Sequence, residues 1–472
     1  MMKSKKVILY PSVFVGHIVP MVELAKQFVG HGISVTIPVM NVGSAPDLVS
    51  EICCNSNHPN ISFHILPQIV TPLNPHPVPS VNLFNMMKLN NDSFRSFLIE
   101  QSQTSPISGV VLDMICVDAL DVIYELGIPA YFFMASSAAN LAVNFQLPTY
   151  FATRSIVGPL KDIGKTPLLF HGVPPLTASH LPHFSNEAFD PEKEQYKLLM
   201  NVFDRLPEGK GILVNSFESL ESRAVMALKD GLCLSNRSTP SIYCIGPLIT
   251  GQENKEEQQH PCLSWLDAQP KKSVVFLCFG SKGSFPIEQL KEIAIGLENS
   301  GQRFLWVVGS PPNHDTAMFF APTAEPDLDI LLPEGFLERT RDRGLIVKQW
   351  APQVEVLKHE AVGGFVSHCG WNSTLEAVSF GVPMICWPLC VDQKINKVVL
   401  VEEMKIGIEL KGYDEGFVQA DELEAKVKWI IGSEGGAELR NRMMKVKESA
   451  IKAMKEGGSS FHAFAEFLEC LN

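Results

Sequence analysis

Short runs of apolar residues alternate with amphipathic stretches along the whole chain. Uninterrupted apolar runs are typical of parallel strands buried on both faces, and the amphipathic stretches between them are typical of covering helices. The predicted strands are Val7–Tyr10, Ser34–Pro38, Val110–Leu112, Ala130–Phe133, Ile212–Asn215, Val274–Cys278, Phe304–Val308, Gly363–Ser367 and Pro383–Cys386. The predicted helices include Pro20–Gly30, Ile287–Ser300 and Asn372–Phe380. This alternation predicts an α/β protein with doubly wound, Rossmann-like sheets.

One polar segment interrupts the alternation. Residues Thr250–His260 read TGQENKEEQQH, which lacks a hydrophobic anchor and is typical of a linker. We therefore expect two domains, residues 1–249 and 261–455, joined by a linker at 250–260, and a chain of 472 residues is long enough for both. Two doubly wound domains that face each other leave a cleft, with ligands at the carboxyl ends of the strands.

Composition narrows the class of partner. The chain has 46% hydrophobic residues, 19% charged residues and a net charge of −12, which indicates a globular protein whose main partner is neither nucleic acid nor an anionic membrane. No apolar stretch approaches the roughly 18 residues of a membrane span. The eleven cysteines are irregularly spaced, without the pairs of a disulfide framework or a zinc site. We expect a soluble, cytoplasmic monomer with reduced thiols.

The segment around residue 370 has the features of an anion site. GGFVS is typical of a strand, HCGWN of a loop, and STLEAVSF of the first turns of a helix that Asn372 or Ser373 caps. A loop that leads into a helix presents free N–H groups and the positive end of the helix dipole. His368, Asn372 and Ser373 add side-chain donors, which suits a diphosphate leaving group. An ordinary capped helix would give the same local pattern.

The surroundings favour a nucleotide-sugar site over an ordinary helix. Trp350 and Gln353 supply a flat aromatic face and an amide for a base. Asp392 and Gln393, after the next strand, supply an acid and an amide for sugar hydroxyls. All four residues would lie on the rim formed by the carboxyl ends of the strands.

A candidate base lies in the first domain. His17 follows the first strand, in the predicted loop before a helix that begins near Pro20, where a lone histidine can also be purely structural. A catalytic histidine needs a partner that fixes its tautomer. Asp113 ends a predicted strand and is suitably placed, whereas the competing Asp118 and Asp121 fall in the following helical stretch.

The stretch Trp350–Gln393 resembles, nearly end to end, the signature box of plant family-1 UDP-dependent glycosyltransferases of the flavonoid and phenolic glucosyltransferase type. Other stretches resemble the same family, so that the resemblance covers nearly the whole chain. These stretches are Val214–Glu221 (VNSFESLE), Tyr243–Leu248 (YCIGPL), Ser264–Phe285 and Glu456–Ser460 (EGGSS).

The resemblance implies the GT-B fold, with the acceptor bound by the first domain, UDP-glucose by the second, and a C-terminal helix at about 456–472 packing back on the first. It implies that His17 is the general base, and the match of VVLDMIC favours Asp113 as its partner. The implied UDP contacts are Ser281, Trp350, Ala351, Gln353, His368, Gly370, Asn372, Ser373 and Glu376. The implied sugar contacts are Trp371, Asp392 and Gln393.

The expected reaction is inverting transfer of glucose from UDP-glucose to the hydroxyl of a small, flavonoid-like phenol. No cofactor or metal is expected, because the helix dipole and side-chain donors suffice for the diphosphate. Two positions depart from the family pattern: Cys390 replaces a common aromatic, and Ala135 replaces a threonine whose hydroxyl can touch the sugar. The alternatives are a C-glucosyltransferase, a GT-B nucleotide-sugar epimerase and a UDP-sugar sensor without catalysis.

Overall fold

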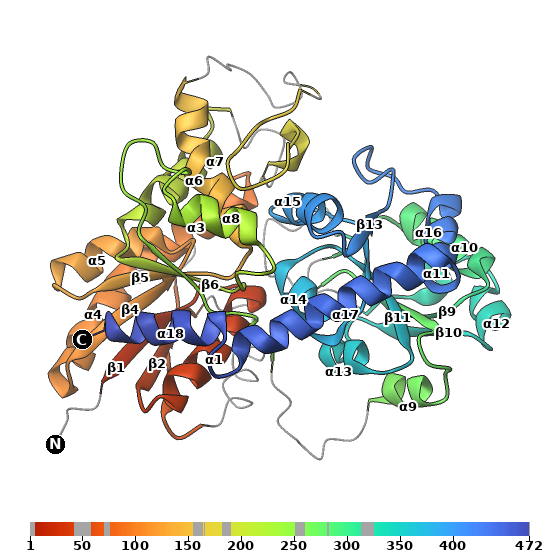
Figure 1. Cartoon of the computed structure of the whole chain (residues 1–472), viewed down its shortest axis with the longest axis horizontal. Coiled ribbons are helices and arrows are strands. Elements are labelled where there is room, and N and C mark those ends of the chain that lie inside the picture. The colour runs from red at the N-terminus through yellow and green to blue at the C-terminus, as the bar shows by residue number, and fades with distance from the viewer. Residues whose placement is uncertain are drawn as a thin grey trace.

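Two parallel sheets carry the fold (Figure 1). The computed structural model describes residues 5–41, 58–69, 76–153, 164, 166–181, 190–250, 260–280, 283–312 and 325–471. A seven-stranded sheet of order β3-β2-β1-β4-β5-β6-β7 forms the first half of the molecule, and a six-stranded sheet of order β10-β9-β8-β11-β12-β13 forms the second. The strands are β1 (Lys6–Tyr10), β2 (Ser34–Val39), β3 (Ile61–Ile65), β4 (Ile107–Asp113), β5 (Ala130–Met134), β6 (Gly211–Val214), β7 (Ser241–Cys244), β8 (Val274–Cys278), β9 (Arg303–Val308), β10 (Gly344–Lys348), β11 (Val362–Ser367), β12 (Met384–Cys386) and β13 (Gly407–Glu409).

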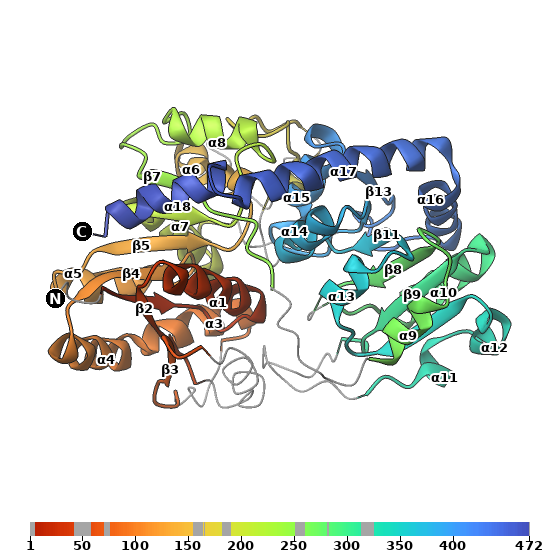
Figure 2. The same ribbon diagram turned by 60° about the horizontal axis from the view of Figure 1, so that its bottom comes forward.

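Helices cover both sheets (Figure 2). In the first half they are α1 (Val15–Gly30), α3 (Pro79–Leu89), α4 (Asn91–Thr104), η1 (Val117–Ala119), α5 (Leu120–Glu125), α6 (Ala138–Thr153), η3 (Ala178–His180), α7 (Glu194–Arg205), η4 (Leu206–Glu208) and α8 (Ser222–Lys229). In the second half they are α9 (Pro261–Asp267), α10 (Ile287–Ser300), α11 (Leu328–Leu331), α12 (Phe336–Thr340), α13 (Gln353–Lys358), α14 (Trp371–Phe380), α15 (Gln393–Val398), η5 (Val399–Glu403), α16 (Ala420–Gly432) and α17 (Glu434–Met454).

Alternate residues of most interior strands enter different cores. In β1, Ile8 and Tyr10 belong to the core shared with α3–α7, whereas Val7 and Leu9 belong to the core shared with α1 and the C-terminal helix α18 (Ser459–Glu469). Side chains of successive strand residues point to opposite faces, so a strand covered on both faces needs apolar residues throughout. This arrangement explains the uninterrupted apolar runs.

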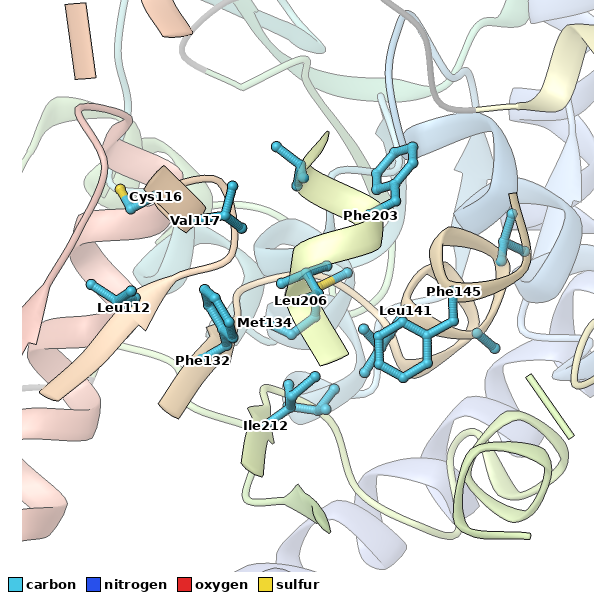
Figure 3. Close-up of a cluster of buried hydrophobic side chains, with 14 of the residues drawn as sticks. Leu112, Cys116, Val117, Phe132, Met134, Leu141, Phe145, Phe203, Leu206 and Ile212 are labelled. Atoms are coloured by element: carbon cyan, nitrogen blue, oxygen red, sulfur yellow. The ribbon is translucent and has the colours of Figure 1, made fainter. Parts of the chain in front are cut away.

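The core that the first sheet shares with α3–α7 lies beneath the ends of β4 and β5, next to polar residues such as Asp113. Figure 3 shows Phe132 and Met134 of β5 packed with Leu141 of α6, Leu206 of η4 and neighbouring apolar side chains. The cluster also includes Leu112, the residue before Asp113. Close packing beneath the strand ends fixes the positions of the residues that follow them.

The chain returns to the first half at its end. Helix α17 packs against α14 and α16, and α18 packs against β7 (Figure 1). Phe464 and Phe467 of α18 lie in the same core as Phe28 of α1, and the Tyr131 hydroxyl donates to the carbonyl of Cys470 at 3.0 Å. Of the predicted linker, only Thr250 and His260 belong to the described residues. No helix within the described ranges is both long and apolar enough to cross a membrane.

Candidate active site

The histidine that follows the first strand lies inside a helix. The pattern predicted a helix beginning near Pro20, but α1 begins at Val15, so His17 lies in its first turn rather than in a loop. Proline lacks the amide hydrogen that donates to the carbonyl four residues earlier, which makes it typical of a helix start. Here that carbonyl belongs to Gly16, and it accepts a hydrogen bond of 2.8 Å from the Asn372 side chain. A residue of the second half thus compensates for the proline.

His17 and Asp113 meet at the switch point of the first sheet, where β1 and β4 are neighbours. His17 Nδ1 lies 2.7 Å from Asp113 Oδ2. Asp113 is fully buried, and its other oxygen accepts a hydrogen bond of 3.1 Å from the backbone N–H of Ile115. Because an ionised carboxylate only accepts hydrogen bonds, the proton lies on Nδ1, and the lone pair of the neutral imidazole lies on Nε2.

Carboxylates from both halves act on this imidazole. Burial lowers the pKa of His17, but the charge and hydrogen bond of Asp113 and the charge of Asp392 raise it, and the net pKa lies above its ordinary value of 6.5. The His17 side chain remains 26% exposed. It can therefore exchange a proton with a bound ligand, and its protonated form is stabilised when it does.

The competing aspartates are engaged elsewhere. Arg205 Nη2 lies 2.6 Å from Asp121 Oδ1, and Arg205 Nη1 lies 3.8 Å from Asp118 Oδ1. Asp118 also accepts a hydrogen bond of 3.2 Å from Asn201 Nδ2. The geometry selects Asp113 as the partner of His17, as predicted.

In the second half, His368 follows β11 and packs between two glycines. A Cβ atom added to Gly280 would lie 2.7 Å from His368 Nε2, and one added to Gly370 would lie 2.3 Å from it, so both positions require glycine. Burial lowers the pKa of His368 to about 4, which keeps the imidazole neutral at pH 7. Its Nδ1 is buried without a hydrogen-bond partner among the described residues. A neutral imidazole carries one N–H, which it can donate to a bound anion.

Helix α14 presents its N-terminus next to this histidine. It begins at Trp371, one residue before the predicted start, with Gly370 as the N-cap and no side-chain cap. The predicted caps Asn372 and Ser373 therefore lie inside the first turn. The N–H groups of that turn have no intrahelical acceptor, so they are available to a ligand, and the helix dipole favours a negative charge there.

The predicted base and ribose contacts form one group. The Trp350 side chain is 66% exposed, whereas Ala351 is buried. Gln353, the first residue of α13, donates from Nε2 to Glu376 Oε2 at 2.6 Å and to Ser373 Oγ at 2.9 Å. Burial raises the pKa of Glu376 to about 7, although the Gln353 hydrogen bond opposes the shift. The second half thus offers an exposed aromatic face at Trp350, and a buried acid with a pKa near neutrality at Glu376.

Two of the predicted sugar contacts already have protein partners. The Trp371 side chain is buried, and its indole N–H donates to the carbonyl of Asn215 at 2.6 Å. Gln393 Oε1 accepts hydrogen bonds from the backbone N–H groups of Leu389 and Cys390 at 2.9 and 3.0 Å. The Trp371 hydrogen bond therefore joins the two halves, and the Gln393 side chain holds the loop of residues 389–390. The contacts of both residues with a sugar stay predictions.

The third predicted sugar contact, Asp392, faces the first half. Its Oδ2 accepts a hydrogen bond from Ser136 Oγ. Ala135 lacks the hydroxyl of the family's threonine, and Ser136, one residue later, brings a hydroxyl to Asp392 instead. Asp392 also contributes to the raised pKa of His17, so its carboxylate lies near that imidazole.

Other predictions lie beyond these contacts. Ser281 is outside the described residues. Within the described part of the chain, no group of three or more His, Cys, Asp or Glu side chains is arranged to hold a metal, and each described cysteine is free. That no metal is needed stays a prediction.

The sequence did not reveal three further residues that join the halves. They are Asn215, which accepts from Trp371, and Ser137 and Asn396, which form a hydrogen bond of 2.9 Å between Ser137 Oγ and Asn396 Oδ1. The one sequence signal that could have indicated them is a polar residue within an apolar run, because a buried polar side chain needs a hydrogen-bond partner.

Known proteins share this architecture. Residues 242–437 match the family model described as UDP-glucoronosyl and UDP-glucosyl transferase. The anthocyanidin 5,3-O-glucosyltransferase of a Rosa hybrid cultivar is 42% identical, with 99% of each chain covered. The chain belongs to this family of UDP-glycosyltransferases. Another member, the phloretin 2'-O-glucosyltransferase of Malus domestica, is 43% identical and covers 98% of this chain and 99% of its own.

Solved UDP-glycosyltransferase structures agree with this assignment. Phytolacca americana UGT2, complexed with UDP-2fluoro-glucose and pterostilbene, superimposes with a TM-score of 0.88 at 32% identity and covers 99% of this chain and 100% of that one. The two facing sheets are the GT-B fold of these enzymes, as predicted. The chain is therefore a UDP-dependent glycosyltransferase of the hexosyltransferase class.

Proposed function

We propose that this enzyme transfers glucose from UDP-glucose to a phenolic hydroxyl of a flavonoid-like small molecule, with inversion at the sugar. The observation that carries the proposal is the 2.7 Å contact between His17 Nδ1 and the buried Asp113 carboxylate, with Asp392 of the second half close enough for its charge to raise the pKa of His17. The acceptor class follows the anthocyanidin and phloretin named for the two relatives.

In this proposal His17 is the general base. Asp113 holds the Nδ1 hydrogen, so that Nε2 accepts the proton of the acceptor hydroxyl while its oxygen attacks the anomeric carbon. A phenol with a pKa of about 10 is within reach of such a base, and the raised pKa of His17 narrows the difference. As UDP leaves, the configuration at the anomeric carbon inverts to a β-glycoside.

The donor occupies the second half. Uracil stacks on Trp350, the ribose hydroxyls donate to Glu376, and Asp392 and Gln393 take the sugar hydroxyls. The diphosphate lies at the N-terminus of α14, where backbone N–H groups, His368, Asn372 and Ser373 stabilise the charge that develops on UDP. Because these donors are fixed before the reaction, the proposal needs no metal.

Product analysis tests the reaction. The enzyme is incubated with UDP-glucose and phloretin or an anthocyanidin, with a fully O-methylated acceptor as the matched control. We expect a mass increase of one hexose on the phenols alone, and release of the sugar by acid. A product whose sugar survives acid identifies a C-glucosyltransferase, and epimerised UDP-sugar without transfer identifies an epimerase.

A pair of histidine variants tests the base. His17→Ala should abolish transfer while UDP still binds in calorimetry, because the donor site does not include His17. His31→Ala, at the other end of α1 and exposed, should retain transfer. Undiminished turnover by the His17 variant would remove His17 from the mechanism.

A further inference from the structure

Helix α15 of the second half is inserted into the core of the first. Its apolar residues Ile395 and Val398 belong to the same cluster as the first-half helices α3–α8 and the interior strands of the first sheet. Helices α15 and α6 are in contact. Asn396 lies between those two apolar residues and is fully buried, so every polar atom of its side chain needs a partner within the protein.

The amide of Asn396 finds those partners on three different segments. Its Oδ1 accepts a hydrogen bond from Ser137 Oγ, at the start of α6, at 2.9 Å. Its Nδ2 donates to the carbonyl of Cys369 at 3.1 Å and to Asp392 Oδ2 at 3.2 Å. Asp392 Oδ2 also accepts from Ser136 Oγ. One buried side chain thus links the end of β5, the His368 loop and the acid at the sugar end.

The contact with Cys369 bears on the diphosphate site. Cys369 has a φ of +62°, a left-handed conformation that is unfavourable for a residue other than glycine and persists only when its surroundings hold it. It lies between His368 and Gly370, the N-cap of α14. The hydrogen bond from Asn396 to its carbonyl fixes the turn that orients both the His368 ring and the first N–H groups of the helix.

We propose that Asn396 is a positioning residue for the donor: it holds the diphosphate loop and the Asp392 carboxylate in register with each other and with the first half. Asn396 does not touch the donor, because its side chain has no exposed surface. The inference rests on the donor site proposed above. A leucine would fill the same volume if packing were the only requirement, but it would leave the Cys369 carbonyl and Ser137 without their partner.

The test is Asn396→Asp, which has nearly the same shape. The aspartate still accepts from Ser137 but no longer donates to the Cys369 carbonyl, and it places a second carboxyl beside Asp392. The matched control is Gln289→Glu, in which an equally buried amide of α10 makes the same kind of contacts with the backbone of Val418, 2.8 Å in each direction. Both variants place a carboxyl in a buried amide site, but only one site adjoins the donor.

Calorimetric binding of uridine, UDP and UDP-glucose gives the readout, and none of these titrations needs an acceptor. For Asn396→Asp we expect uridine affinity within twofold of wild type, and UDP and UDP-glucose affinities lower by about tenfold, the cost of one unsatisfied buried hydrogen bond. The loss should diminish as the pH falls, because a proton shared by Asp392 and the new aspartate restores a donor. Gln289→Glu should lower the melting temperature without changing the ratio of the three affinities.

Two outcomes would overturn the proposal. One is an Asn396→Asp enzyme with all three affinities at wild-type level; the other is equal weakening of all three ligands in both variants, which is the effect of lost stability alone. If Asn396→Asp does not fold, Ser137→Ala removes the hydrogen bond to Asn396, together with the one that Ser137 Oγ accepts from the Asn140 N–H at the start of α6. This variant should weaken UDP-glucose binding severalfold, and unchanged binding overturns the proposal as well. Failure of the phenol assay would leave these binding results unaffected, so the two proposals fail separately.

Discussion

The proposed contact of Glu376 with the ribose predicts that nucleoside binding depends on pH. Burial raises the pKa of Glu376 to about 7, so half of these carboxyls are protonated at neutrality in the free enzyme. Ribose hydroxyls donate best to the ionised carboxylate, so ligand binding favours the ionised form and lowers its pKa. By linkage, affinity must increase with pH up to the pKa of the free enzyme.

The size of the effect follows from the raised pKa of Glu376. With a pKa of about 7, the ionised fraction of Glu376 falls about tenfold between pH 8 and pH 6, and uridine affinity should fall by the same factor. A glutamate with its ordinary pKa of 4.5 would change by only a few per cent over this range. Burial of this one carboxyl therefore accounts for the whole predicted slope.

Uridine is the ligand of choice because it carries no phosphate that titrates in this range. Calorimetric titrations at pH 8, 7 and 6 measure the slope in wild type and in Glu376→Gln, which should bind more weakly and without the slope. Glu360→Gln, an exposed glutamate paired with Lys271, should keep the wild-type slope. Equal affinity at pH 8 and pH 6, or a slope that persists in Glu376→Gln, refutes the assignment of Glu376 to the ribose.

Two further changes test the base and its helix. Asp113→Asn keeps the shape of the partner but removes the charge that raises the pKa of His17, so kcat should fall by about 10³ to 10⁴, as in serine-protease triads. The acidic limb of the wild-type kcat/KM profile should lie above pH 6.5, because only neutral His17 accepts the proton; a limb below pH 6 would contradict the raised pKa. Pro20→Ala gives α1 an N–H that competes with Asn372 for the Gly16 carbonyl, so the KM for UDP-glucose should rise about fivefold, the value of roughly one hydrogen bond, while the melting temperature holds or rises. An unchanged KM would mean that the Asn372 contact does not affect the donor.

Interior strands could be predicted from the sequence, and edge strands could not. Every predicted strand corresponds to an interior strand of its sheet, and β8 and α10 have the predicted bounds. The four missed strands, β3, β7, β10 and β13, are the edges of the two sheets. An edge strand has a neighbouring strand on one side only, so it is less buried than an interior strand. In β10 no residue is buried, and its apolar run is correspondingly short and flanked by polar residues.

The same distinction applies to the site. His17 and Asp113 could be predicted because His17 comes after β1 and Asp113 is the last residue of β4, and these two strands are neighbours at the switch point. The pairing of Ser137 with Asn396 could not, because 259 positions separate them and neither local pattern indicates a partner. The predicted start of α1 was wrong because the hydrogen bond to the Gly16 carbonyl, which Pro20 cannot donate, comes from the Asn372 side chain in the other half of the chain.

The packing of the last helix, α18, on the first half has a practical consequence for labelling experiments. Both β1 and α18 belong to the first half, so the first strand and the last helix lie on the same body (Figure 1). A pair of dyes attached to β1 and α18 would report unfolding of that half and would be insensitive to any change in the second. A distance probe between the two halves needs one label on α16 or α10.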